Sequence, residues 1–363
     1  FGFMDNDTLL ACFTQDGLWQ LATIDTQSLN LNIIETPYVD ISALHCQSGK
    51  AIFIGGAHKD FEEIVTYQSD QMSTLVRAGD KPPAENNLSS AQAISFAVTE
   101  DESAHGFYYP PCNANFSAPE NDLPPLIVLC HGGPTGATSS ALSLKIQYWT
   151  SRGFAIFDIN YRGSTGYGRR YRDRLKKNWG ICDVEDVCAG ARYLVEKKLA
   201  HPDKLAIKGG SAGGYTVLAA LTFSDVFNAG ASHYGVGDLE SLAKDTHKFE
   251  ARYLDQLIGP YPEQQEIYHA RSPINSIDQL NCPVIFFQGL DDKVVPPNQA
   301  EAMVAALNAK HIPCAYVPFE GEGHGFRQGP NIKRALEGEL YFYGQLFKFT
   351  PADVIEPLTI KNV

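Results

Sequence analysis

The chain has 363 residues, of which 44% are hydrophobic and 20% charged, and its formal net charge at pH 7 is −13. This length is sufficient for two domains and a large buried core. The acidic balance argues against nucleic acid and anionic membranes as partners. No apolar run approaches the length of a membrane span and no signal-peptide pattern opens the chain, so we expect a cytoplasmic protein. Because the first residue is Phe1 rather than Met, the natural start of the protein is left open.

Eight cysteines are scattered along the chain, and none forms a C-x-x-C pair. Several lie in apolar stretches, which is typical of reduced, buried thiols. We therefore expect no structural zinc or other metal site, and no residue pattern indicates a cofactor.

Residues 1–79 contain stretches of strand length separated by turn signals, without helical periodicity. The expected strands are residues 8–14, 18–25, 32–35, 43–46, 51–55, 62–68 and 73–76. A meander of this kind, in units of roughly 40–50 residues, suggests a β-propeller. Fewer than two such units fit here, whereas a propeller needs about four blades or more. We expect residues 1–85 to be the C-terminal part of a longer propeller; the alternative is a small accessory sheet.

The pattern changes after residues 81–90, which are polar and broken by prolines, as expected of a linker. Residues 91–98 and 104–109 predict a hairpin. Short apolar strands then alternate with helical stretches. The strands are expected at residues 126–130, 154–159, 205–208, 229–233, 284–287 and 315–318, and the helices at 141–151, 183–198, 215–223, 298–309 and 331–347. This alternation predicts an α/β domain over residues 86–363, with a mostly parallel sheet covered by helices on both faces. Residues 237–281 are too many for a simple crossover and are expected to form a helical cap.

Ser211 lies in the sequence Gly209-Gly210-Ser211-Ala212-Gly213, between an expected buried strand and an expected helix. This is the G-x-S-x-G pattern in the strand–turn–helix context of a nucleophile elbow. Glycines are needed on both sides because side chains there would clash with the neighbouring strand and helix. The amide of Ala212 would point at the space above the serine. The alternative is a glycine-rich turn with an incidental serine.

Other reactive residues also follow strands, where the working groups of such sheets gather. His131-Gly132-Gly133-Pro134 follows the first parallel strand, and its glycines leave backbone amides free to face an oxyanion. Asp291 and Asp292 follow residues 284–287, and His324 follows the last strand. The order Ser, Asp, His is that of an α/β-hydrolase triad. Spacing alone does not choose between the two aspartates, because adjacent side chains of an extended segment point to opposite sides.

Several further groups have plainer explanations. His131 competes with His324 as the base, but its position suits a structural role beside the glycine loop. The basic residues 169–177 are expected to be a solvated helix face. Glu320 and Glu322 could bind an amine, but solvated loop carboxylates are the default. The tyrosines of the cap, Tyr253, Tyr261 and Tyr268, are expected to serve packing.

Seven segments together resemble the prolyl oligopeptidase family of serine peptidases, in its branch of acylaminoacyl-peptidases and dipeptidyl- or aminopeptidase-like members. They are residues 131–134, 160–168 (NYRGSTGYG), 179–180, 183–186, 209–214, 292–296 and 323–326. The resemblance extends from about residue 91 to the C-terminus. It implies an α/β-hydrolase domain joined to a seven-bladed propeller that admits only short peptides, and the N-terminal stretch would then be the last blade or two of that propeller.

By this resemblance, Ser211 is the nucleophile, Asp292 the acid and His324 the base. The amides of Gly133 and Ala212 would then be the oxyanion donors. One departure is Gln288, which stands where many members have a histidine.

We therefore expect a serine peptidase that hydrolyses short peptides through an acyl-enzyme, as an exopeptidase or an oligopeptidase. A carboxylesterase on the same fold is the alternative, because the triad does not distinguish amides from esters; the propeller-like strands favour the peptidase. A third hypothesis is a non-catalytic binding protein, for which a lost triad member would be the sign, and none is lost. The expected partners are short peptides, and a homo-oligomer is left open.

Overall fold

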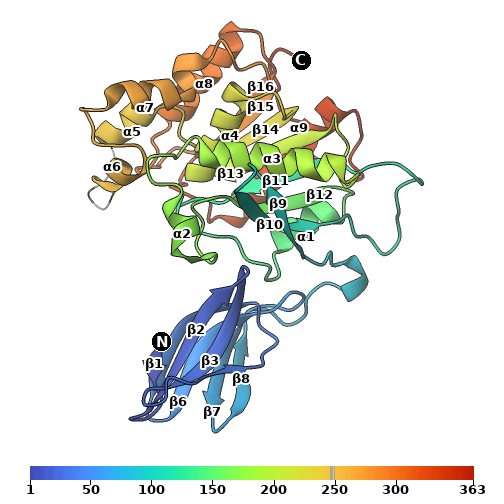
Figure 1. Cartoon of the computed structure of the whole chain (residues 1–363). Coiled ribbons are helices and arrows are strands. Elements are labelled where there is room, and N and C mark those ends of the chain that lie inside the picture. Colours follow the sequence, from blue (N-terminus) through green and yellow to red (C-terminus); the bar gives the residue numbers. More distant parts are fainter. Residues whose placement is uncertain (246–247, 249) are drawn as a thin grey trace.

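The computed structural model describes residues 1–245, 248 and 250–363. The chain forms a smaller N-terminal part built of antiparallel strands and a larger part in which helices surround a central sheet (Figure 1). Residues 78–91 connect the two parts and include the short 3-10 helix η1 (Glu85–Asn87). The division into two domains near residue 85 stays a prediction.

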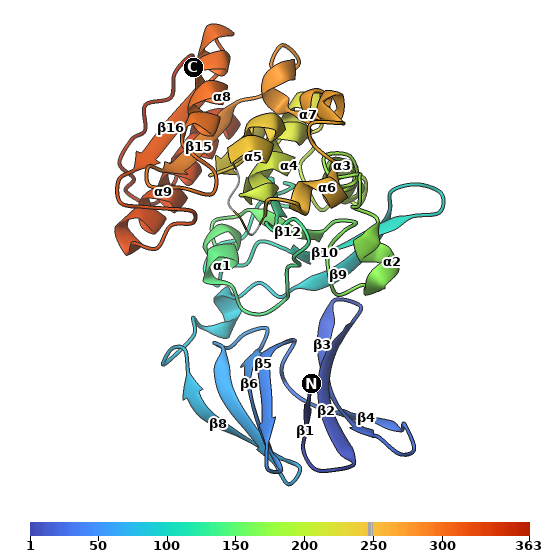
Figure 2. The ribbon, with the colours of Figure 1, turned by 90° about the vertical axis from the view of Figure 1, so that its left-hand side faces the viewer.

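The N-terminal part contains two four-stranded antiparallel sheets, which lie next to each other below the larger part (Figure 2). The first sheet consists of β1 (Gly2–Phe3), β2 (Thr8–Gln15), β3 (Leu18–Asp25) and β4 (Leu31–Ile34), and the second of β5 (Asp40–Gln47), β6 (Lys50–Gly56), β7 (Glu63–Gln68) and β8 (Gln71–Arg77). One core joins them, to which Leu10, Leu21, Phe53 and Val65 belong. Four-stranded sheets are the units of β-propellers, so the expected partial propeller is confirmed.

The expectation that fewer than two blades fit into this stretch is wrong, because the strands are joined by very tight turns. Asp16 and Gly17 connect β2 to β3 with φ values of 53° and 78°. Residues 48–49 and 69–70 form equivalent turns, again with positive φ at both positions. Two-residue turns of this type match the twist of the flanking strands. Each sheet is therefore completed within fewer residues than a typical blade uses.

Eight strands form the central sheet, in the order β16-β15-β14-β13-β11-β12-β10-β9. They are β9 (Gln92–Ala97), β10 (Ser103–Tyr109), β11 (Leu126–Cys130), β12 (Ala155–Asn160), β13 (Leu205–Gly210), β14 (Ala229–His233), β15 (Val284–Gly289) and β16 (Cys314–Phe319). The strands from β11 to β16 pair in parallel, whereas β10 pairs antiparallel with β12 and with β9. The predicted hairpin and all six predicted parallel strands are confirmed, with ends shifted by at most two residues.

Helices cover both faces of this sheet. On one face lie α1 (Leu144–Thr150) and α9 (Gly329–Phe347), and on the other α3 (Cys182–Glu196), α4 (Ala212–Phe223) and α8 (Asn298–Ala309). Because both faces are covered, strands such as β12 and β15 are buried along their whole length, which explains why most of their residues are apolar. This arrangement is the predicted α/β-hydrolase fold.

Among its described residues, the segment after β14 contains three helices, as expected of a helical cap. They are α5 (Leu239–Asp245), α6 (Tyr253–Leu257) and α7 (Gln265–Arg271), followed by the 3-10 helix η2 (Pro273–Ser276). Residues 246, 247 and 249 of the predicted cap lie outside the described residues. The basic residues 169–177 begin in the short helix α2 (Gly168–Asp173), where Arg169, Arg170 and Arg172 are exposed. The part of the run within α2 is thus a solvated helix face, whereas residues 174–177 lie beyond the helix and include the buried Leu175.

The sheet order decides where the reactive segments meet. β13 lies between β11 and β14. The earlier strands β9 to β12 lie on one side of it and the later strands β14 to β16 on the other, so the order in which strands are added reverses between β11 and β13. This reversal is the switch point at which open α/β sheets bind their ligands. The segments that follow β11, β13, β15 and β16 all begin at the same edge, because these strands are parallel.

All eight cysteines are free thiols. Five are buried, whereas Cys12, Cys46 and Cys112 are half-buried, so the expectation of buried thiols is correct only for the α/β part beyond Cys112. Within the part of the chain that the structure describes, no helix is long and apolar enough to cross a membrane.

Candidate active site

Ser211 lies on the sharp turn between β13 and α4. Its backbone has φ 57° and ψ −123°, a left-handed conformation that non-glycine residues rarely adopt. The flanking glycines are required by close packing: a Cβ atom at Gly209 would lie 2.4 Å from the carbonyl oxygen of Gly213, and one at Gly213 would lie 2.2 Å from that of Cys130. The turn therefore holds the serine at the carboxyl edge of the sheet in the strained geometry of a nucleophile elbow.

Ser211, His324 and Asp292 form a continuous hydrogen-bond relay. Ser211 Oγ lies 2.8 Å from His324 Nε2, and His324 Nδ1 lies 2.8 Å from Asp292 Oδ2. The other carboxylate oxygen of Asp292 accepts hydrogen bonds from the backbone N–H groups of Val294 and Val295, at 2.8 and 2.9 Å. Asp292 is only 4% exposed. These bonds fix the carboxylate, which in turn orients the imidazole so that Nε2 can accept the serine proton.

Asp291 does not take part in this relay. It is exposed, and its backbone N–H donates to the carbonyl oxygen of Glu322 at 2.9 Å. Of the two adjacent carboxylates, the structure thus brings Asp292 to His324 and leaves Asp291 at the surface.

The glycine loop after β11 passes beside the serine. A Cβ atom at Gly132 would lie 3.7 Å from Cβ of Ser211. The next residue, Gly133, is exposed and has φ 121°, a conformation that favours glycine. Ala212 is the first residue of α4, so its N–H is not used by the helix itself. The two predicted oxyanion donors therefore lie on the two segments that border Ser211.

Glu322 is not a solvated carboxylate, and this corrects the prediction. It is 2% exposed and accepts hydrogen bonds from the backbone N–H groups of Arg327 and Gln328 and from Asn331 Nδ2, at 2.9–3.0 Å. Burial raises its pKa, but these hydrogen bonds outweigh burial and leave the pKa below its ordinary value. Glu322 thereby ties down the loop that carries His324. Glu320 is exposed, as expected.

Gln288 braces the loop that carries the acid. It is fully buried, and its Nε2 donates to the carbonyl oxygens of Gly289 and Val295, both at 3.1 Å. These two carbonyls lie on either side of Asp292 in the sequence. The residue that departs from the family pattern thus binds the acid loop on both sides of Asp292.

Tyr234 was not singled out from the sequence, yet it lies against the histidine. Its ring packs edge-on against that of His324, with centroids 4.9 Å apart, and against Phe326 at 5.3 Å. The only sequence signal is its position just after β14, at the edge of the sheet where the other reactive residues lie. The contact restricts the imidazole to the orientation of the relay.

The cap tyrosines differ from one another. Tyr268 is fully buried and donates to the carbonyl oxygen of Gly259, as expected of a packing residue. Tyr261 packs against it, with ring centroids 5.2 Å apart. The hydroxyl of Tyr253, however, lies 2.7 Å from Thr135 Oγ1, just after the glycine loop. The cap therefore contacts the loop that borders Ser211.

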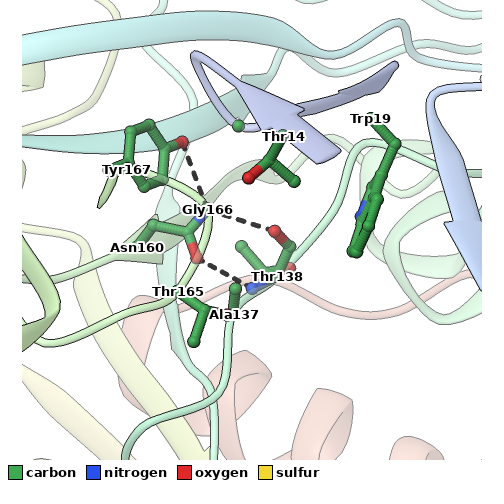
Figure 3. A pocket seen from close by; sticks show the side chains of 9 residues that line it. Thr14, Trp19, Ala137, Thr138, Asn160, Thr165, Gly166 and Tyr167 are labelled. Carbon is green, nitrogen blue, oxygen red and sulfur yellow. Dashed lines mark hydrogen bonds between the residues drawn. The ribbon is translucent and has the colours of Figure 1, made fainter. Parts of the chain in front are cut away.

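A small pocket of about 160 Å³ lies where the N-terminal part meets the segment after β12 (Figure 3). Thr14 and Trp19, next to the turn between β2 and β3, line one side, and Thr138, Asn160 and residues 165–167 line the other. None of the residues that line this pocket is charged. At this pocket the first N-terminal sheet therefore lies against residues 137–138, which follow the glycine loop.

Comparison with known proteins agrees with this geometry. Residues 140–350 match the model of the prolyl oligopeptidase family. The chain is 33% identical over 215 residues to dipeptidyl aminopeptidase BIII of Pseudoxanthomonas mexicana, covering 58% of this chain and 31% of that protein. It is 24% identical over 326 residues to acylamino-acid-releasing enzyme 1 of Oryza sativa subsp. japonica, covering 85% of this chain and 40% of that protein.

A solved structure of a puromycin-hydrolyzing peptidase of Mycobacterium tuberculosis superimposes with a TM-score of 0.94 and 42% sequence identity, covering 98% of this chain and 54% of that one. The chain thus spans less than half of each of these two curated relatives and about half of this solved structure. The matched family region includes Ser211, Asp292 and His324. The chain therefore belongs to the prolyl oligopeptidase family.

Proposed function

We propose that this chain contains the catalytic apparatus of a serine peptidase that hydrolyses short peptides. The observation that supports this proposal most strongly is the relay from Ser211 through His324 to Asp292, with both hydrogen bonds at 2.8 Å. A serine hydroxyl is a weak nucleophile until a base takes its proton. The relay supplies that base in the required tautomer.

The reaction follows from the positions of these groups. Ser211 Oγ attacks the scissile carbonyl carbon while its proton moves to His324 Nε2, and the carbonyl oxygen becomes an oxyanion. The amides of Ala212 and Gly133 are the donors proposed to bind this oxyanion. Collapse of the tetrahedral intermediate breaks the C–N bond, and His324 gives its proton to the leaving amine. Water then attacks the acyl-enzyme by the same steps and releases Ser211.

Two observations support short peptides as the substrates. Two blade-like sheets lie beside the α/β part, and in this family a propeller limits access to the site. The names of similar proteins also refer to small substrates: one is a dipeptidyl aminopeptidase and another a puromycin-hydrolyzing peptidase. We therefore propose short peptides as the substrate class.

The first test is covalent labelling with a fluorophosphonate, read by intact mass and peptide mapping. We expect one adduct, on Ser211, and none in Ser211→Ala. The absence of an adduct, or an adduct elsewhere, would refute the assignment of the nucleophile.

The second test compares substrates at equal concentration: aminoacyl, X-Pro and acyl-blocked peptide amides, matched esters, and casein. We expect the peptide amides to be hydrolysed and casein to be left intact. Hydrolysis of the esters alone would indicate a carboxylesterase, and digestion of casein as fast as of a dipeptide would refute the limit on substrate size.

A further inference from the structure

We propose that His131 is a positioning residue for the oxyanion hole and acts through the peptide bond between Gly132 and Gly133. This inference rests on the proposed function, in which the Gly133 amide binds the oxyanion. The imidazole Nδ1 of His131 lies 2.9 Å from the carbonyl oxygen of Gly132. In a planar trans peptide the C=O group and the next N–H point in opposite directions. A bond that fixes the Gly132 carbonyl therefore also fixes the direction of the Gly133 N–H.

The surroundings of the ring fit one neutral tautomer of His131. Its Nε2 lies 2.7 Å from Ser164 Oγ, which also lies 2.8 Å from the carbonyl oxygen of Tyr161. A neutral imidazole has one N–H and one acceptor nitrogen. With the proton on Nδ1, the ring donates to Gly132, and the single hydroxyl proton of Ser164 turns toward Nε2 instead of toward the Tyr161 carbonyl. The other tautomer would place two acceptors, Nδ1 and the Gly132 oxygen, 2.9 Å apart.

The ring is also fixed by stacking and stays neutral. The rings of His131 and Tyr161 are stacked, with centroids 4.2 Å apart and planes inclined by 15°. Loss of solvation around the ring lowers the pKa of His131 to about 4. Near neutral pH the imidazole is therefore uncharged and keeps the single N–H that the carbonyl needs. This role also explains why His131, although it lies close to Ser211 in the fold, is not its base.

The segment after β12 holds the rest of the glycine loop in place. The fully buried Tyr161 donates its hydroxyl to the carbonyl oxygen of Pro134 at 2.9 Å, and Thr165 N–H donates to that of Gly136 at 2.9 Å. Further along, the side-chain amide of Asn160 binds both the N–H and the carbonyl of Thr138, at 2.8 and 3.1 Å (Figure 3). These bonds secure the loop after Gly133, whereas His131 is the one side chain among the described residues that bonds to the peptide unit containing the Gly133 N–H.

The test uses His131→Leu and His131→Asn in the full-length protein. Leucine keeps much of the volume but cannot donate, whereas the asparagine amide can place an N–H near the position of Nδ1. Removal of a whole oxyanion donor costs about 10²–10³ in kcat, so we expect misorientation in His131→Leu to lower kcat by about 10–100-fold with little change in KM. His131→Asn should retain most of the activity.

Two inhibitors separate a positioning role from a general structural one. A peptide aldehyde forms a hemiacetal with the serine and places an oxyanion in the hole, whereas a product peptide binds without one. His131→Leu should weaken the aldehyde by about the factor lost in kcat and leave the affinity of the product peptide unchanged. Equal weakening of both would refute the proposal, as would unchanged kcat in His131→Leu or an asparagine variant no better than leucine.

A matched control is His58→Leu, because His58 Nδ1 also lies 3.0 Å from a backbone carbonyl, that of Ser140, but not on the donor peptide. We expect its kcat to equal that of the wild type. If His131→Leu does not fold, Ser164→Ala keeps the ring and removes the partner of Nε2, and should lower kcat by a smaller factor; unchanged kcat there would count against the proposal. A wild-type protein without peptidase activity would instead refute the proposed function.

Discussion

Replacement of Asp292 by Asn tests the catalytic relay most directly. Asp292 Oδ1 accepts two backbone N–H groups, from Val294 and Val295, so the amide oxygen of Asn fits only at this position. The Nδ2 group then takes the place of Oδ2, 2.8 Å from His324 Nδ1, and donates to that nitrogen. The proton of the neutral imidazole is left on Nε2, which faces Ser211 Oγ and can no longer accept its proton.

The size of this effect follows from the role of the tautomer. In a Ser-His-Asp triad the wrong histidine tautomer costs about 10⁴ in kcat. At about 1.36 kcal/mol for each factor of ten, this loss is about 5.4 kcal/mol of transition-state stabilisation. The shape of the site is retained, because Asn has the size of Asp, so we expect kcat to fall by this factor without loss of the fold.

The assay is kcat on one short peptide amide, with circular dichroism to verify folding. Asp291→Asn is the matched control: it lies next in the chain but is exposed, and we expect a change within about twofold, as for other surface substitutions. The reasoning would be refuted by a folded Asp292→Asn that keeps kcat close to wild type, or by a larger loss in Asp291→Asn.

Three further substitutions test buried or closely packed residues of the α/β part. Burial raises the pKa of Asp158 to about 7, above the value near 3.9 of an unfolded chain. The folded protein therefore favours the protonated form of Asp158, and the free energy of unfolding of the protein falls as the pH rises from about 4 to 7. Asp158→Asn should therefore raise stability at pH 8, on the order of 2–4 kcal/mol, and not at pH 4, as measured by urea unfolding; an equal effect at both pH values would contradict this. Gly213→Ala would place a Cβ atom 2.2 Å from the Cys130 carbonyl oxygen and should cost about 1–3 kcal/mol or more, seen as a lower Tm; an unchanged Tm would contradict the close packing. Glu322→Gln would turn an NH₂ group toward a backbone N–H that the carboxylate now satisfies, such as that of Arg327; we expect a cost of about 1–3 kcal/mol in thermal unfolding and a lower kcat, whereas wild-type values of both would show that Glu322 does not hold the histidine loop.

Local patterns in the sequence were sufficient for most of the architecture. Alternating apolar strands and helices predicted the parallel sheet, because a strand buried on both faces is mostly apolar. The glycines around Ser211 predicted the sharp turn, because only glycine fits where a Cβ atom would lie little more than 2 Å from a neighbouring backbone oxygen. The number of blade-like sheets was underestimated, because the two-residue turns shorten each sheet below the usual length.

Spacing could not decide which side chains meet across the sheet edge. Asp291 and Asp292 are equivalent in the local pattern, and the family resemblance was needed to choose between them. In the structure the choice depends on the backbone N–H groups of Val294 and Val295, which hold one carboxylate inward. Tyr234 could not be assigned a role for the same reason, because its contact with His324 joins residues 90 positions apart in the chain.

Tertiary structure also decided which charged and polar groups are buried. Glu322 was expected in solvent because a carboxylate in a loop is solvated by default. It is buried because three donors from the following residues converge on it and because its loop packs closely over Gly289, where a Cβ atom would lie 2.4 Å from the Glu322 carbonyl oxygen. His131 gains its neutral, oriented ring from Ser164 and Tyr161, which follow the next strand. The sequence by itself thus determined the strands and helices of the α/β part and the reactive residues that follow its strands. The pairing of distant strands decided which of those residues touch, because hydrogen bonds and burial depend on neighbours in space.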